Sequence, residues 1–97
     1  MLFGKLTITY PDKRQRIFPL TKATIRIGRT SDNDVILDDE RISRHHADIL
    51  CSEDGLEVLD LGSTNGVHLG GFRIPTNQPV PVPDRSILEL GRIRIRP

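Results

Sequence analysis

The sequence has few cysteines, little net charge and no long apolar run. Cys51 is the only cysteine among 97 residues, so no intramolecular disulfide can form, and its thiol is compatible with a reducing compartment. The formal net charge is +1, which gives no long-range attraction to nucleic acid or to a membrane surface. No apolar run approaches the roughly 20 residues that a helix needs to span a bilayer. These absences argue against disulfide-stapled, strongly basic and membrane-inserted proteins.

The length and composition that remain predict one soluble globular domain. Hydrophobic residues make up 36% of the chain and charged residues 28%, which is a balance that a disordered protein rarely has. The 97 residues fit a single domain over 1–97, and the chain can equally be one module of a longer protein. A domain of this size buries about 60% of its unfolded surface, so its core is modest but sufficient.

Apolar and polar residues alternate with a period of two along most of the chain, which predicts half-buried β-strands. No segment sustains the spacing of an amphipathic helix, and turn-forming residues separate the alternating runs at short intervals. We therefore expect an all-β sandwich or barrel. The predicted core positions are Leu6, Ile8, Tyr10, Ala23, Ile25, Ile27, Ala47, Ile49, Cys51, Ile93 and Ile95.

Three segments carry more specific structural predictions. Val35-Ile36-Leu37 is a continuous apolar run, which predicts a strand that is buried on both faces. Asn65-Gly66 is the strongest short hairpin signal in the chain and suits a type I′ turn. Five of the seven prolines follow residue 70, which predicts edge strands and irregular connections in that part.

A polar segment, Ser43-Arg44-His45-His46, interrupts this pattern, and Arg29 follows Gly28 at the end of an apolar strand. A hydroxyl beside a guanidinium suits an anion, because charge-assisted hydrogen bonds are about twice as strong as neutral ones. Arg29 alone can instead be a surface arginine that pairs with Asp32 or Asp34. Ser43 and Arg44 alone can be a strand-start serine followed by a solvated arginine.

His46 has three possible roles, as a general base, a metal ligand or a structural hydrogen-bonding group. Adjacent strand residues point to opposite faces, so His45 and His46 are poor partners for one metal ion. A hydrolase that uses Ser43 and His46 is also disfavoured, since side chains three residues apart on a strand diverge. The sequence lacks phosphate-loop, zinc-protease and paired-cysteine motifs. We expect no enzyme activity, no metal and no cofactor, and we expect His46 to tie a loop to a strand.

Arg92, Arg94 and Arg96 form a basic stripe near the end of the chain. No aromatic residues interleave them, so a solvated strand face is favoured over a nucleic-acid platform. Together with the proline-rich stretch 75–83, the stripe motivates a second hypothesis about function. In that hypothesis the chain is a phosphate-independent structural or assembly module that docks through a sandwich face or edge.

The polar segments, taken in order, resemble the forkhead-associated (FHA) domain family, and the similarity covers about residues 4–96. The resemblance implies a two-sheet β-sandwich of about eleven short, mostly antiparallel strands. It also implies a binding module, not an enzyme, that recognises phosphothreonine in partner proteins through loops at one end of the sandwich. The segments that carry the resemblance are Gly28-Arg29, Asn33-Asp34-Val35-Ile36-Leu37, Ser43-Arg44-His45-His46, Asp60-Leu61-Gly62-Ser63-Thr64-Asn65-Gly66 and Leu88-Glu89-Leu90-Gly91.

The resemblance also implies roles for single residues, carried over by position. The implied phosphate contacts are Arg29, Ser43, Arg44 and Thr64. Asn65 is implied to bond the peptide main chain, and Arg41 to read a residue C-terminal to the phosphothreonine. The residues implied to shape and brace the loops are Gly28, His46 and Gly66.

The same resemblance implies the cellular setting and marks one departure from the family. The expected partner is a phosphothreonine-containing protein or peptide, or a phosphorylated domain attached to or associated with this one. The isolated domain is expected to be monomeric and intracellular. Where the family commonly has Asn-Gly at the turn after residue 69, this chain has Gly70-Gly71, which also supports a tight hairpin turn.

Overall fold

Eleven β-strands make up the regular structure of this protein, whose computed structural model describes residues 2–97. In chain order they are β1 (Lys5–Thr9), β2 (Gln15–Pro19), β3 (Thr24–Gly28), β4 (Val35–Ile36), β5 (Ala47–Ser52), β6 (Gly55–Asp60), β7 (Val67–Leu69), β8 (Phe72–Arg73), β9 (Val80–Val82), β10 (Leu88–Leu90) and β11 (Ile93–Arg96). Residues 2–97 contain no helix, and hence none that could cross a membrane. The predicted all-β class is confirmed.

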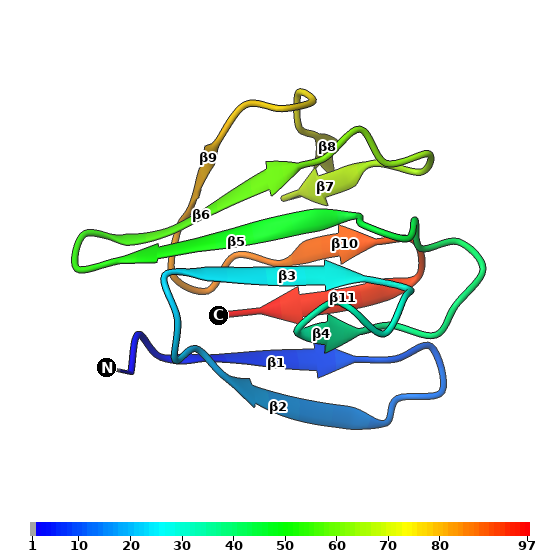
Figure 1. The fold of residues 1–97 in the computed structure, drawn as a ribbon, viewed down its shortest axis with the longest axis horizontal. Coiled ribbons are helices and arrows are strands. Elements are labelled where there is room, and N and C mark those ends of the chain that lie inside the picture. Colours follow the sequence, from blue (N-terminus) through cyan, green and yellow to red (C-terminus); the bar gives the residue numbers. More distant parts are fainter. Residues whose placement is uncertain (1) are drawn as a thin grey trace.

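The strands form two sheets that pack against each other (Figure 1). One sheet has six strands in the order β2-β1-β11-β10-β7-β8, and the other has five in the order β4-β3-β5-β6-β9. Neighbouring strands pair antiparallel, with the exception of β3 and β4, which run parallel. The β-sandwich of eleven mostly antiparallel strands that the resemblance implied is therefore confirmed.

Period-2 alternation places one face of each central strand in the core between the sheets. Cys51 packs there as a small apolar residue, and burial raises the pKa of its thiol. Ala23 is a correction, because it precedes β3 and is exposed, so the buried face of that strand begins at Ile25. The predicted core positions that are at most 7% exposed are Leu6, Ile8, Ile25, Ile27, Ala47, Ile49, Cys51, Ile93 and Ile95.

The prediction that Val35-Ile36-Leu37 is buried on both faces is wrong. Val35 and Leu37 are fully buried, but Ile36 is 40% exposed. The reason is that a two-sheet sandwich covers only one face of each strand. Ile36 lies on the outer face of its sheet, as Thr24 and Arg26 do on the neighbouring β3. Val35 and Leu37, on the opposite face of the segment, pack into the core between the sheets.

The prediction of a hairpin turn at Asn65-Gly66 is also wrong. These residues connect β6 to β7, which belong to different sheets, so the chain crosses the sandwich there. Gly66 has a φ of 78°, but Asn65 is not in the left-handed region that a type I′ turn requires at both positions. The tight hairpin lies instead at Gly70-Gly71, where both φ values are positive, 58° and 86°, and Leu69 pairs with Phe72.

The edge strands fall partly where the prolines predicted. Pro81 lies in β9, which is the edge strand of the five-stranded sheet, and an irregular connection precedes it. The edge strand β2 had no alternation that could reveal it, because Ile17 faces outward and is 60% exposed. Its pairing with β1 defines it, from Lys5 opposite Pro19 to Thr9 opposite Gln15.

Three connections gather at one end of the sandwich, which is the right-hand end in Figure 1. They are the β3–β4 loop (residues 29–34), the β4–β5 loop (residues 37–46) and the β6–β7 loop (residues 61–66). The β3–β4 and β4–β5 loops flank the edge strand β4, and the β6–β7 loop crosses between the sheets. This end of the molecule carries every residue to which the resemblance assigns a role, apart from Gly28 at the very end of β3.

Candidate functional site

The three loops are joined by direct hydrogen bonds around Ser43. The backbone N–H of Arg29 donates to the carbonyl of Ser43 at 3.0 Å, which links the β3–β4 loop to the β4–β5 loop. The backbone N–H of Thr64 donates to Ser43 Oγ at 3.1 Å, which links in the β6–β7 loop. The structure therefore brings Arg29, Ser43 and Thr64 together, although 35 residues separate the first from the last.

Gly28 permits the close approach of the first two loops. A Cβ added at this position would lie 2.1 Å from the carbonyl oxygen of Arg44 and 2.7 Å from Asn33 Nδ2. Gly28 is the one glycine of this chain without a positive φ among those described, so the requirement is the missing side chain and not a special backbone angle. The Arg44 carbonyl occupies the space that any other residue would fill.

The guanidinium of Arg29 is oriented by the neighbouring loop. Arg29 Nε donates to the carbonyl of Ile42 at 3.0 Å, and its two terminal nitrogens have no partner within residues 2–97. Pairing with Asp32 or Asp34, the alternative for this arginine, does not occur, because those carboxylates bind His45 and Lys22. Arg29 is exposed, so its terminal nitrogens can meet a ligand.

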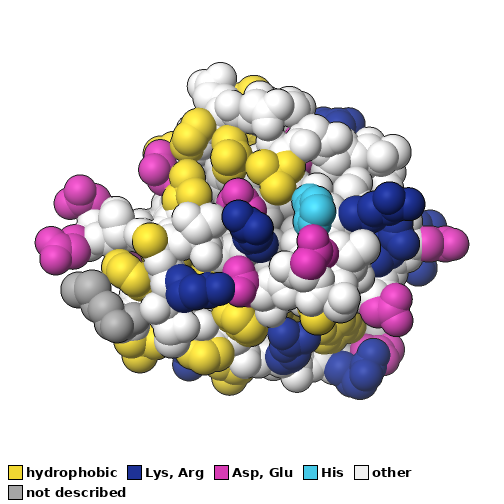
Figure 2. All heavy atoms as spheres, in the orientation of Figure 1, with side chains coloured by type: hydrophobic (Ala, Val, Ile, Leu, Met, Phe, Trp, Pro, Cys, Tyr) yellow, Lys and Arg dark blue, Asp and Glu magenta, His cyan; other side chains and the backbone are white. Residues whose placement is uncertain are grey.

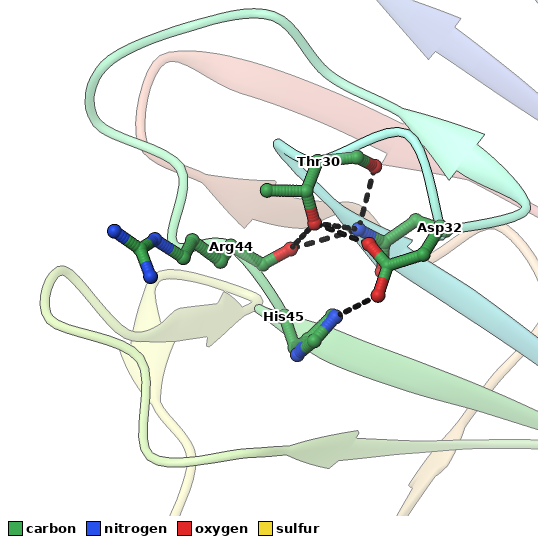
Figure 3. Close-up of polar contacts among 5 residues, drawn as sticks. Thr30, Asp32, Arg44 and His45 are labelled. Carbon is green, nitrogen blue, oxygen red and sulfur yellow. Dashed lines mark hydrogen bonds and ion pairs between the residues drawn. The ribbon is translucent and has the colours of Figure 1, made fainter.

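Arg44 is held by its backbone, which leaves its side chain free. Its carbonyl accepts from Asn33 Nδ2 at 2.8 Å, from Thr30 Oγ1 at 3.2 Å and from the backbone N–H of Arg29 at 3.1 Å. Figure 3 shows the side chain of Arg44 extending away from Thr30, Asp32 and His45. In Figure 2, Lys and Arg side chains lie beside Asp and Glu side chains at this end of the molecule.

His46 is a completely buried side chain that braces two loops. Its Nδ1 accepts from the backbone N–H of Ser43 at 3.1 Å, and its Nε2 lies 2.8 Å from the carbonyl of Gly66. A carbonyl can only accept, so Nε2 carries the proton. Because Nδ1 is occupied by the Ser43 backbone, neither ring nitrogen is left to take the proton of the Ser43 hydroxyl.

This burial makes stability depend on pH. Desolvation lowers the pKa of His46, although the bond to Gly66 opposes that effect. A histidine in the unfolded chain binds a proton near pH 6.5, whereas the folded protein keeps His46 neutral to lower pH. Below that pH the unfolded state binds more protons, so stability falls as pH falls.

We expect the thermal midpoint to drop between about pH 7.5 and about pH 5.5. A His46→Gln variant is expected to be less stable at neutral pH and to show a smaller drop on acidification. Calorimetric melting curves of both chains at matched pH values test this. Parallel pH profiles for the two chains would contradict the assignment to His46, since His45 and His68 are present in both.

Asn65 and Arg41 form a further link between the β6–β7 and β4–β5 loops. Asn65 Nδ2 donates to the carbonyl of Arg41 at 2.8 Å, and the backbone N–H of Arg41 donates to Asp39 Oδ1 at 2.8 Å. Both side chains are exposed, and the guanidinium of Arg41 forms no ion pair within residues 2–97. Asn65 Oδ1 accepts no hydrogen bond within residues 2–97, so it can accept one from a ligand.

Asn33 organises the site, a role that no pattern in the sequence indicates. It is 7% exposed, and its Nδ2 donates to the carbonyls of Thr30 at 2.9 Å and of Arg44 at 2.8 Å. Asn33 lies in one of the segments that carry the family resemblance. The sequence therefore marks the segment, but it does not reveal the hydrogen bonds that Asn33 makes. The pair His45–Asp32, with Nε2 and Oδ2 at 2.6 Å, covers the same loop (Figure 3).

Arg73 on β8 and the buried Ser63 both stabilise the β6–β7 loop. A Cβ on Gly66, whose φ is 78°, would lie 2.5 Å from Arg73 Nε, so the arginine packs against the bare glycine. Ser63 is buried and donates to Asp60 Oδ1 at 2.5 Å. No local sequence signal pointed to Arg73, because its contact depends on the β7–β8 hairpin.

The comparison with known proteins agrees with this geometry. The FHA domain family pattern matches residues 25–91. The chain is 48% identical over 59 residues to the transcriptional regulatory protein EmbR of Mycobacterium tuberculosis, which covers 61% of this chain but only 15% of EmbR. This chain therefore corresponds to only a small part of the length of EmbR.

Two solved structures share the fold over nearly the whole chain. Mycobacterium tuberculosis EmbR in complex with a low affinity phosphopeptide superposes with a TM-score of 0.82 and 32% identity, over 96% of this chain and 24% of that one. The FHA domain of FhaA, complexed with the intracellular domain of Rv3910, superposes with a TM-score of 0.80 and 27% identity, over 94% of this chain and 97% of that one. The family pattern and these superpositions show that the chain belongs to the forkhead-associated (FHA) domain family.

Proposed function

We propose that this chain binds phosphothreonine-containing segments of partner proteins at the end of the sandwich where the three loops meet. The observation that carries the proposal is the junction at Ser43, which receives a hydrogen bond from Arg29 N at its carbonyl and from Thr64 N at its hydroxyl. Each loop thereby contributes one residue to a single cluster. Donors that converge from three directions suit a tetrahedral phosphate, whose oxygens also point in different directions.

The cluster has donors to spare for a phosphate. The terminal nitrogens of Arg29, the guanidinium of Arg44 and the hydroxyl of Thr64 have no partner within residues 2–97. Ser43 Oγ accepts one hydrogen bond and still has its own proton to donate. A phosphorylated threonine brings three acceptor oxygens and a charge of about −1.5 to −2, which two guanidiniums and two hydroxyls can match without a metal ion.

Asn65 is proposed to hold the peptide main chain next to the phosphothreonine. Its amide offers a donor and an acceptor, which is the pair that an extended backbone requires. In the free protein, Nδ2 donates to the carbonyl of Arg41, so Oδ1 remains for a peptide N–H. The neighbouring Arg41 side chain is exposed and unpaired, and we propose that it favours an acidic or carbonyl-rich residue C-terminal to the phosphothreonine.

The proposal is for a binding module without catalytic activity. His46 braces the loops through both ring nitrogens, which supports a structural role in place of a general base. The proposed partner is a phosphothreonine-containing protein or peptide, or a phosphorylated domain attached to or associated with this one. The complexes of EmbR with a phosphopeptide and of FhaA with an intracellular domain support this kind of partner and an intracellular setting.

A library of phosphothreonine peptides with randomised flanking residues tests the proposal. We expect micromolar binding of a subset of peptides and no binding of the same peptides without phosphate. An unphosphorylated peptide presents no anionic group to the free donors of the site. Selected peptides resynthesised with phosphoserine measure the contribution of the threonine methyl, which is worth about 0.8 kcal/mol when it is buried. A library without any phosphate-dependent ligand would contradict the proposed function.

A further inference from the structure

A row of three arginines lies along the outer face of the six-stranded sheet. It begins near the loop end of the sandwich, since a Cβ on Gly91, next to Arg92, would lie 3.1 Å from Arg41 Cβ, and it runs along β11 away from the phosphate site (Figure 1). Arg92, Arg94 and Arg96 are exposed, whereas Ile93 and Ile95 between them are buried. We call these three residues the arginine stripe. Since β11 lies between β1 and β10, the stripe runs along the middle of the sheet and not along an edge.

The charge of the stripe is not neutralised within the protein. The ion pairs within residues 2–97 join Arg14 to Asp12, Lys22 to Asp34 and His45 to Asp32, and none includes the stripe. Glu89 lies opposite Arg94 in the register of β10 and β11, yet it forms no ion pair with that arginine. Three guanidiniums therefore stand on one face with their hydrogen-bond donors free of carboxylates.

Two hollows follow the stripe and meet at Arg94 and Thr9. The first has a volume of about 250 Å³ and is lined by Thr7, Thr9, Gln15, Ile87, Arg94 and Arg96. The second has a volume of about 280 Å³ and is lined by Thr9, Tyr10, Pro11, Lys13, Arg92 and Arg94. Neither lining contains a carboxylate, and we call the two adjoining hollows together the cationic trough.

We infer that this trough docks an extended acidic segment of a partner protein. Alternate residues on a strand are about 6.8 Å apart, so the arginines of the stripe repeat at the same interval as alternate carboxylates on an extended peptide. A guanidinium binds a carboxylate with two parallel hydrogen bonds, which favours a geometric match over diffuse attraction. The threonine hydroxyls that line the first hollow, at Thr7 and Thr9, add donors beside the stripe.

The opposite face of the sandwich does not offer this arrangement. The outer face of the five-stranded sheet, seen in Figure 2, intersperses Lys and Arg with Asp and Glu. A nucleic-acid strand is less suited than a peptide to the trough, because stacking needs open aromatic faces. Tyr10 is the one ring in the trough linings, and Arg14 already lies over it, 5.4 Å from its centroid.

A double variant, Arg94→Gln with Arg96→Gln, tests the inference in the whole chain. The probe is a short unphosphorylated peptide that alternates glutamate with threonine, and its partner peptide has glutamine in place of glutamate. We expect the parent chain to bind only the glutamate peptide, with an affinity that falls as salt rises. The double variant is expected to bind it about tenfold more weakly, since each exposed ion pair contributes modestly.

Matched controls separate docking from general attraction and from the phosphate site. Arg26→Gln removes an equally exposed arginine from a central strand of the opposite sheet, and it is expected to leave glutamate-peptide binding unchanged. Arg29→Ala is expected to leave it unchanged too, so this inference and the proposed function can fail independently. Equal binding by the double variant, equal loss in Arg26→Gln, or tighter binding of single-stranded DNA or anionic vesicles than of the peptide would overturn the inference.

Discussion

Replacing Arg29 with alanine is expected to weaken the binding of a selected phosphothreonine peptide by about 2–5 kcal/mol, which amounts to loss of measurable binding for a micromolar ligand. The physical reason is the preset orientation of this guanidinium. Its Nε is held by the carbonyl of Ile42 at 3.0 Å, and both terminal nitrogens are left for the phosphate. A phosphate bound beside an alanine would lose its best bidentate donor and keep its desolvation cost.

Titration calorimetry of the parent chain and of Arg29→Ala with one selected peptide measures this effect. Arg26→Ala is the matched control, because Arg26 is an exposed arginine on the same strand as Gly28 but points from the outer face of the sheet. Its phosphopeptide affinity is expected to equal that of the parent. If Arg29→Ala binds as tightly as the parent chain, Arg29 does not hold the phosphate and the site is wrongly assigned.

Replacing Gly28 with alanine is expected to reduce both stability and phosphopeptide affinity. The new Cβ would meet the carbonyl oxygen of Arg44 at 2.1 Å, which is far inside any van der Waals contact. The β3 end or the β4–β5 loop must shift, and such overpacking costs about 1–3 kcal/mol of unfolding free energy. The same shift separates Arg29 from Ser43, so the phosphate donors no longer converge.

Gly70→Ala is the control that separates a stability loss from a loss of the site. Gly70 has a φ of 58° with no atom close to an added Cβ, so its substitution costs about 1–2 kcal/mol through backbone strain alone. It also lies beside Ile87 at the start of β10, at the end of that strand away from the loops (Figure 1). Denaturant melts and peptide titrations of both variants test the pair. Equal phosphopeptide affinities for the two variants would contradict a role of Gly28 in shaping the site.

Alternation along the chain predicted the core because the side-chain period of a strand is a local property. Ile25 and Ile27, or Ile93 and Ile95, are buried since residues two apart share a face, whatever the partner strand is. The ordered polar blocks carried the family resemblance for a similar reason, since each block is contiguous. Both kinds of prediction need only neighbouring residues.

The errors arose where the outcome depends on how the sheets are assembled. The run Val35-Ile36-Leu37 has the composition of a strand buried on both faces, but each sheet has a partner layer on one side only, which leaves Ile36 exposed. Asn65-Gly66 has the composition of a hairpin turn, but the strands on either side of it belong to different sheets. Neither fact can be read from the residues themselves.

The sequence by itself determined which polar residues this protein has to offer and in what order: an arginine after Gly28, the run from Ser43 to His46, and the run from Ser63 to Gly66. The tertiary structure alone decided which of them meet. Asn33 holds the Arg44 carbonyl, His46 joins Ser43 to Gly66, and Arg73 packs on Gly66 from β8, the strand paired with β7. These contacts join different loops and strands, so they exist only when the sandwich has closed and the burial of its core has offset the entropy of ordering three loops.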